Sequence, residues 1–196
     1  DSLQQWRLWG RHRYMRYRSH NGRLRERRNP IQYLQDEGYL ANIERKKVTT
    51  HIDIELTDAE RKHVETFFEL PPGVLEKLAD DTERNACILF ELLELHEKGK
   101  STIVFACSVD HAHLLTELCM LRGIQARCIE GETTAFDRKK WIEDYKNGSI
   151  RVLINYGVLT TGFDAPNTDS VLITRPTNSI VLYSQMVGRG IRGPKM

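Results

Sequence analysis

The chain has 196 residues, of which 40% are hydrophobic and 29% are charged, and its formal net charge is +2. This length and apolar fraction favour a folded globular protein with one good core over a disordered chain. No apolar run is long enough to span a bilayer, and the Arg-rich start lacks the apolar core of a signal peptide. The composition therefore predicts a cytoplasmic protein without a membrane partner.

Cysteine and histidine do not predict a metal site. Cys87, Cys107, Cys119 and Cys128 are scattered in apolar contexts with no CxxC spacing, which is typical of reduced, buried thiols. His111 and His113 lie two apart, and residues two apart on a helix point to different faces. We therefore expect no metal ligands in this chain.

The basic charge is concentrated at the start of the chain. Residues 1–28 hold nine arginines against two acidic residues, so this segment carries +7 and the remainder carries −5. Four aromatic residues, Trp6, Trp9, Tyr14 and Tyr17, are interleaved with the arginines. Such a segment can grip a phosphate backbone and stack on bases, or it can be a solvated connector, and the sequence favours neither.

A smaller, mixed α/β or helical extension is predicted over residues 29–87. Asn29 can cap a short helix, Pro30 fits its first turn, and Gly38 ends it. Apolar residues alternate over 47–56, which predicts a strand.

Two further helices are predicted before the regular part of the chain. A capping box from Thr57 to Glu60 begins one helix that continues to about residue 70, and the Pro71-Pro72-Gly73 run stops it. A second helix, over 82–98, has its leucines on one buried side and ends at Gly99.

From residue 100 onward, strands and helices alternate. The predicted strands are 102–106, 125–129, 152–155 and 170–174, and the predicted helices are 109–122, 134–146 and 180–187. Such alternation implies parallel βαβ units, so residues 88–196 are predicted to form a doubly wound α/β domain. Its ligands should gather at the carboxyl ends of the strands.

Two blocks near the end of the chain suggest phosphate chemistry. Residues 154–166 read as an apolar run that ends in a Gly-rich turn with a carboxylate. Residues 185–193 carry Arg189 and Arg192, which are three apart and share one helix face. Guanidinium groups bind phosphate oxygens through forked, charge-assisted hydrogen bonds and stay charged, so this pair can clamp a phosphate.

The run Gly99-Lys100-Ser101-Thr102 looks like the end of a phosphate-binding P-loop, but its context is wrong. A P-loop has another glycine where this chain has Glu94, and it follows a strand and begins a helix. Here a helix precedes the run and a strand follows it. We therefore find neither a P-loop nor an acidic magnesium motif in the sequence.

Together with Ile103-Val104-Phe105-Ala106-Cys107-Ser108, the two blocks resemble motifs IV, V and VI of superfamily 2 helicases, in the right order. Residues 157–166 are most similar to the branch with type III restriction-enzyme helicase subunits and related DEAD/DEAH-type repair helicases. The resemblance implies the second, RecA-like lobe of an ATP-dependent helicase that acts on nucleic acid, DNA more than RNA. The lobe that holds ATP and Mg²⁺ in this family is missing, so we expect the chain to be part of a longer protein and inactive alone.

The resemblance also implies roles at the nucleotide. Arg189 and Arg192 would act as arginine fingers on the γ-phosphate, and Gln185 would help to orient it. The remaining nucleotide-binding residues by position are Gly162, Asp164 and Gly188. In the family, Gly162 and Asp164 would meet the ribose and transmit closure of the two lobes.

A second set of positions is expected to contact the nucleic-acid strand: Ser108, Gly131, Asn155, Tyr156, Gly157 and Thr160. Ser108 follows its strand and suits either a phosphate contact or a helix cap, and it can do both. Tyr156 replaces a threonine that touches the strand in many relatives, so Asn155, Gly157 or Thr160 would make that contact instead. Gly131 allows close approach of the backbone.

Two functions are therefore compatible with the sequence. The first is the second lobe of an ATP-dependent helicase or translocase. The alternative is a non-catalytic nucleic-acid-binding or regulatory module that keeps the fold without turnover. The complete set of Gln185, Gly188, Arg189 and Arg192 favours the first, because an inactive module does not need matched arginine fingers.

Overall fold

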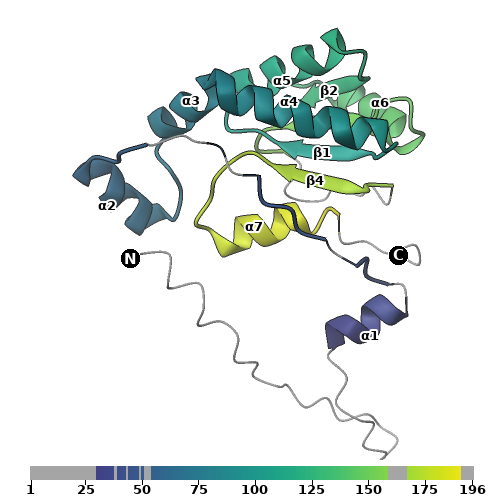
Figure 1. Ribbon diagram of the computed structural model, residues 1–196, viewed down its shortest axis with the longest axis horizontal. Coiled ribbons are helices and arrows are strands. Elements are labelled where there is room, and N and C mark those ends of the chain that lie inside the picture. The colour runs from purple at the N-terminus through teal and green to yellow at the C-terminus, as the bar shows by residue number, and fades with distance from the viewer. Residues whose placement is uncertain are drawn as a thin grey trace, which may run out of the picture.

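The computed structural model describes residues 30–37, 39–42, 44–48, 50, 54–158 and 167–190. Its centre is a four-stranded sheet with the strand order β2-β3-β1-β4, and all three strand pairings are parallel (Figure 1). The strands are β1 (Thr102–Phe105), β2 (Ala126–Ile129), β3 (Val152–Asn155) and β4 (Ser170–Ile173). The predicted parallel α/β sheet is therefore confirmed.

Seven helices lie in the described part of the chain: α1 (Pro30–Asp36), α2 (Asp58–Phe67), α3 (Pro72–Asp80), α4 (Thr82–Glu97), α5 (Val109–Leu121), α6 (Ala135–Lys146) and α7 (Ile180–Val187). From α4 onward, each helix and strand lies within one or two residues of its predicted position, because apolar runs and polar caps mark the ends of each element.

The sheet is buried on both faces, as expected for parallel strands covered by helices. On one face, Val104 and Ile154 pack with residues of α4 and α5, including Leu92 and Leu115. On the other face the core comprises Ile103, Phe105, Ile129, Tyr145, Ile150, Leu153 and Met186, which brings in α6 and α7. Figure 1 shows α3, α4 and α5 on one side of the strands and α7 on the other. The domain is thus doubly wound, as predicted.

Polar side chains fix where several helices begin. The capping box at α2 is confirmed: Thr57 N–H donates to Glu60 Oε2 at 2.8 Å, and Glu60 N–H donates to Thr57 Oγ1 at 3.3 Å. Asp81 Oδ1 accepts from Arg84 N–H at the start of α4, at 2.7 Å. Each cap satisfies a backbone N–H that has no partner within the helix.

Two predictions for residues 29–87 are wrong. The residues of 47–56 that the structure describes, 47–48, 50 and 54–56, are not in a strand, and Ile54 packs against the α3 cluster instead. The helix predicted to continue to about residue 70 and to be stopped by Pro71-Pro72-Gly73 is shorter: α2 ends at Phe67 with Phe68 as its left-handed C-cap, and the proline run begins α3 at Pro72. Proline suits a first helical turn, where its missing N–H costs nothing.

Helix α3 joins the sheet domain through its own apolar cluster. Val74, Leu75, Leu78 and Ala79 are buried with Cys107, which follows β1. This helix was not predicted, because the proline run at its start reads only as a stop. Its packing makes residues 72–80 part of the same body as the sheet.

The thiols are reduced, as predicted, and three of the four are buried. Burial raises the pKa of Cys119 to about 12 and that of Cys128 to about 11. These two thiols are therefore protonated at neutral pH and behave as small apolar side chains.

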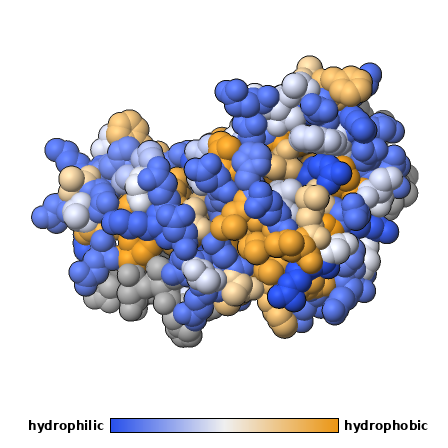
Figure 2. Space-filling view, turned by 90° about the horizontal axis from the view of Figure 1, so that it is seen from above, coloured by the Kyte–Doolittle hydropathy of each residue, from blue (hydrophilic) through white to orange (hydrophobic). Residues whose placement is uncertain are grey.

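Figure 2 views the surface from the side of α3, α4 and α5, and hydrophobic residues gather in the middle of this mainly hydrophilic face. The exposed large apolar side chains of α4 and α5 are Phe90, Leu114, Met120 and Leu121. In the described residues, no helix is long and apolar enough to cross a membrane.

Candidate functional site

The carboxyl ends of the four strands lie side by side, because the parallel register aligns them. Phe105 at the end of β1 is opposite Asn155 of β3 and Ile173 of β4, and Asn155 is in turn opposite Ile129 of β2. The loops that follow these four residues therefore meet at one edge of the sheet, which we call the rim. They carry Ser108, Gly131, Tyr156 with Gly157, and Arg175.

Ser108 is the N-cap of α5 and lies half-buried on the rim. Its Oγ accepts a hydrogen bond from His111 N–H at 3.1 Å, which confirms the predicted cap. The hydroxyl still carries a proton of its own, which it can donate to an anion. The positive end of the α5 dipole lies at the same place and favours negative charge there.

Gly131 lies on an exposed loop that several hydrogen bonds hold in shape. Glu130 N–H donates to Thr133 Oγ1 at 2.9 Å, and Glu132 N–H donates to Glu130 Oε2 at 2.8 Å. Arg138 from α6 donates to Glu130 O at 3.1 Å. A Cβ atom on Gly131 would meet no atom within 4 Å, so the space in front of its backbone is open.

The last residue of β3 and the two residues after it differ in how exposed they are. Asn155 is fully buried, and its side-chain amide donates to Val104 O at 2.9 Å, so this amide is used inside the fold. Tyr156 is half-buried, whereas Gly157 is exposed with φ of +75°, a left-handed conformation that favours glycine. Thr160, Gly162 and Asp164 lie outside the described residues.

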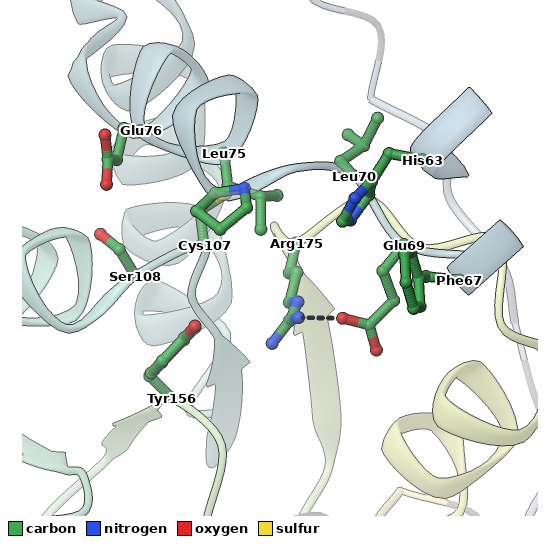
Figure 3. Close-up of a pocket in the computed structure, with 11 residues that line it drawn as sticks. His63, Phe67, Glu69, Leu70, Leu75, Glu76, Cys107, Ser108, Tyr156 and Arg175 are labelled. Atoms are coloured by element: carbon green, nitrogen blue, oxygen red, sulfur yellow. Dashed lines mark hydrogen bonds and ion pairs between the residues drawn. The ribbon is translucent and has the colours of Figure 1, made fainter. Parts of the chain in front are cut away.

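A pocket of about 510 Å³ opens at the rim (Figure 3). Its lining residues are His63, Phe67, Glu69, Leu70, Pro72, Leu75, Glu76, Cys107, Ser108, Tyr156 and Arg175. They come from α2, from the α2–α3 connection, from α3, and from the loops after β1, β3 and β4. The pocket therefore lies between the α2–α3 segment and the rim, the edge at which open parallel sheets bind ligands.

A buried hydrogen-bond network supports the rim from below. Cys107 N–H donates to His111 Nδ1 at 3.1 Å, so the ring proton lies on Nε2, which is 3.0 Å from Asn85 Oδ1 and donates to it. Arg84 donates to Leu78 O at 3.1 Å and also to Thr174 O. Burial, and to a smaller extent the charge of Arg84, lowers the pKa of His111 to about 4.

The second functional block begins on helix α7 but continues past its end at Val187, so Arg189 lies in the turn after the helix and not on the helix face that the sequence predicts. Ser179 caps its start by accepting from Leu182 N–H at 3.2 Å, and Met186 is buried against the sheet. Gln185 and Arg189 are half-buried, and burial lowers the pKa of Arg189 from its ordinary value. Gly188 follows the last turn, with its N–H donating to Ser184 O at 2.9 Å. Arg192 lies outside the described residues.

Residues 84–193 match the family model described as helicase conserved C-terminal domain. The chain belongs to this family. The fold is thus the RecA-like α/β fold of superfamily 2 helicase C-terminal lobes, as the motifs predicted.

Known proteins that are named as helicases are similar to much of the chain. IRC3 of Saccharomyces cerevisiae, whose name describes an ATP-dependent helicase, is 36% identical over 76% of this chain and 21% of its own length. DEAD-box ATP-dependent RNA helicase 9 of Oryza sativa subsp. japonica is 30% identical over 65% of this chain and 20% of its own length. The chain thus spans about a fifth of each relative.

A solved structure shares this fold. The Escherichia coli DEAD-box protein SrmB, crystallised with regulator of ribonuclease activity A, aligns with a TM-score of 0.50 and 27% identity. The alignment covers 56% of this chain and 64% of that chain.

The sequence reasoning missed Arg175 and Glu69, although both line the pocket at the rim of this helicase C-terminal domain. Arg175 is the second residue after β4 and Tyr156 is the first after β3, so the rule about strand ends was enough to find it. Glu69 had no such signal, because its place depends on how α2 folds back to the rim. Among the described residues, no group of three or more His, Cys, Asp or Glu side chains could hold a metal ion.

Proposed function

We propose that this domain is the second lobe of an ATP-dependent nucleic-acid helicase or translocase, which holds one strand at the rim and completes an ATP site on another lobe. The observation that carries the proposal is the alignment of Ser108, Gly131 and Gly157 along one edge of the sheet by the parallel register. Ligands of open parallel sheets bind at this edge.

At the rim, Ser108 would donate its hydroxyl proton to a phosphate, and the start of α5 would add its dipole. Gly131 and Gly157 are both exposed and lack side chains, so a sugar-phosphate backbone can approach their main chain closely. Such contacts position a strand without reading its bases. Thr160, and the main chain at Asn155 and Tyr156, complete the proposed strand contacts.

At the nucleotide, Gln185, Arg189 and Arg192 would face ATP bound to the other lobe, with Gly162, Asp164 and Gly188 beside them. When bound, ATP would supply the γ-phosphoryl group that is transferred to water, and Mg²⁺ would partly neutralise the charge of its phosphates. The arginines would stabilise the charge that develops on its oxygens and would orient the γ-phosphate. The half-buried guanidinium of Arg189 suits this role, because a charge with less water around it interacts more strongly with an anion.

We expect DNA to be preferred over RNA, on the likeness of residues 157–166 to the restriction and repair branch. The similarity to a rice protein named as an RNA helicase makes this a point to test. Competition between unlabelled DNA and RNA strands of equal sequence measures it directly. Equal competition, or better competition by RNA, would overturn the preference.

The strand site is tested by titrating the 196-residue chain against a labelled single strand at several salt concentrations. We expect weak binding with little sequence preference and an affinity that falls steeply as salt rises, because bound phosphates release counterions. Deleting residues 1–28 should flatten that dependence if the nine arginines contribute, and should leave the slope nearly unchanged if the segment is a connector. No binding at low salt, or binding insensitive to salt, would refute the rim.

The ATPase part is tested by comparing this chain with the longer protein. The chain alone should not hydrolyse ATP, because it has no P-loop, whereas the longer protein should, with stimulation by nucleic acid. Turnover by the purified chain would contradict the two-lobed site. Strand binding without ATPase activity in the longer protein would instead support the alternative, a non-catalytic binding module.

A further inference from the structure

The rim pocket contains an ion pair that none of the helicase motifs includes. Arg175, two residues after the end of β4, lies in the middle of the pocket, and its guanidinium points toward Glu69, with Tyr156 and Ser108 on the other side (Figure 3). Arg175 Nη2 is 2.7 Å from Glu69 Oε2. A rim that would otherwise attract phosphate therefore already holds a carboxylate.

The arginine is fixed by the sheet domain and partly shielded from water. Its side chain is 16% exposed, and its guanidinium carbon lies 5.4 Å from the centre of the Tyr156 ring. An arginine over an aromatic face gains cation–π attraction and keeps a defined orientation. The guanidinium is thus set in place to make forked hydrogen bonds to an anion.

The carboxylate comes from a different part of the chain and is more exposed to water. Glu69 lies in the connection between α2 and α3, and its side chain is 41% exposed. A backbone hydrogen bond links this connection to the loop between β4 and α7: Asn178 N–H donates to Phe68 O at 3.0 Å. An ion pair with one such exposed partner contributes little net stability, so another anion can replace the carboxylate at little cost.

Building on the proposed function, we propose that Arg175 binds a backbone phosphate of the nucleic-acid strand, and that Glu69 occupies the phosphate position while the domain is unbound. The strand would have to displace the carboxylate to reach the guanidinium. Glu69 therefore lowers strand affinity, and the α2–α3 connection acts as an internal competitor. A purely structural ion pair has the opposite signature, since breaking it would weaken the fold and would not improve binding.

The test measures binding of the 196-residue chain to a fluorescein-labelled 20-nucleotide oligo-dT by anisotropy, at several salt concentrations. Glu69→Gln should raise the affinity about threefold to tenfold at low salt, because it frees Arg175 and removes a competing charge. The matched control is Glu65→Gln, which removes the same charge from exposed α2 but lies outside the pocket. The result to compare is the gain in affinity of Glu69→Gln beyond the gain of Glu65→Gln.

Arg175→Gln should lower the affinity and reduce the slope of log affinity against log salt by about one, as expected for one lost phosphate contact. Two double variants are then compared. In the Arg175→Gln background, adding Glu69→Gln should raise the affinity no more than adding Glu65→Gln does. Thermal melts of all variants check that each one folds.

The outcomes separate this inference from the proposed function. If the wild-type chain does not bind oligo-dT at low salt, the strand site itself fails. If the wild type binds and Glu69→Gln gains no more than Glu65→Gln, the internal competitor is refuted while the strand site stands. An unchanged salt slope in folded Arg175→Gln would refute the phosphate contact.

Discussion

Gly190 lies so close to Val171 that a Cβ atom on Gly190 would be 2.9 Å from Val171 Cγ2. Val171 belongs to β4 and packs in the core layer that includes Met186 of α7. The second glycine of the Gly188-Arg189-Gly190 run therefore lets the turn that follows α7 rest directly on the sheet. The position of Arg189 depends on this contact.

Replacing Gly190 with Ala should destabilise the domain by about 1–3 kcal/mol, because an added methyl group in a packed site forces neighbours to move. Urea denaturation measures the change. Val171→Ala makes room for the added methyl group. It should therefore lower the stability less in the Gly190→Ala background than in the wild type. Equal costs in both backgrounds would show that the two residues do not compete for the same space.

Acid should destabilise the domain through His111 before most carboxylates titrate. The pKa of His111 in the folded chain is about 4, against an ordinary value of 6.5. The unfolded chain therefore binds a proton that the folded chain does not, so this stability is complete above pH 6.5 and is lost as pH falls toward 4. The expected loss is about 2 kcal/mol at pH 5 and about 3 kcal/mol at pH 4.

The measurement is the urea midpoint of the wild type and of His111→Gln between pH 7.5 and pH 5. The variant should be less stable at pH 7.5, because it disturbs the bonds to Cys107 N–H and Asn85. It should also lose most of the pH dependence in that window. A parallel decline in both proteins would assign the acid sensitivity to other groups.

Gly131 and Gly157 should respond differently to alanine. Gly131 has open space and no left-handed φ, so Gly131→Ala should change stability by less than about 0.5 kcal/mol and yet weaken strand binding several-fold. Gly157 has φ of +75°, so Gly157→Ala should add about 1–2 kcal/mol of backbone strain. Melting curves and strand titrations of both variants test this, and unchanged binding by Gly131→Ala would remove Gly131 from the interface.

In the longer protein, Arg192→Ala should lower the nucleic-acid-stimulated kcat about a thousandfold and leave the KM for ATP nearly unchanged. An arginine finger acts mainly on the charge of the transition state, so its loss affects turnover more than binding. Steady-state ATPase assays with saturating nucleic acid give both constants. Wild-type turnover would take Arg192 out of the ATP site.

The regular part of the fold could be predicted because its local signals agree. Apolar strands, capping residues such as Ser108 and Ser179, and glycine stops such as Gly99 all mark the same boundaries. Helix α3 was not predicted because the Pro71-Pro72-Gly73 run reads as the stop of the preceding helix, whereas α2 already ends at Phe67 and Pro72 begins α3. The apolar residues near Ile54 alternate as in a strand, but a strand needs a partner edge, which a local pattern does not reveal.

The candidate site was predictable in its position and less so in its details. Parallel strands place the residues after Phe105, Ile129 and Asn155 at one edge, and this follows from topology alone. The inward side chain of Asn155 and the pairing of Glu69 with Arg175 depend on packing between distant segments. Neither has a signature in the local sequence.

The strand order also constrains how this chain can fold. The first two strands in the sequence, β1 and β2, do not pair with each other, because β3 lies between them. The partner of Val104 in β3 is Ile154, fifty residues later in the chain, so Val104 has no neighbour in the sheet until Ile154 has been synthesised. A nascent chain that stops short of Val152 therefore has helices but no ladder, and the sheet forms late, from contacts between distant residues, which is typical of slow folding.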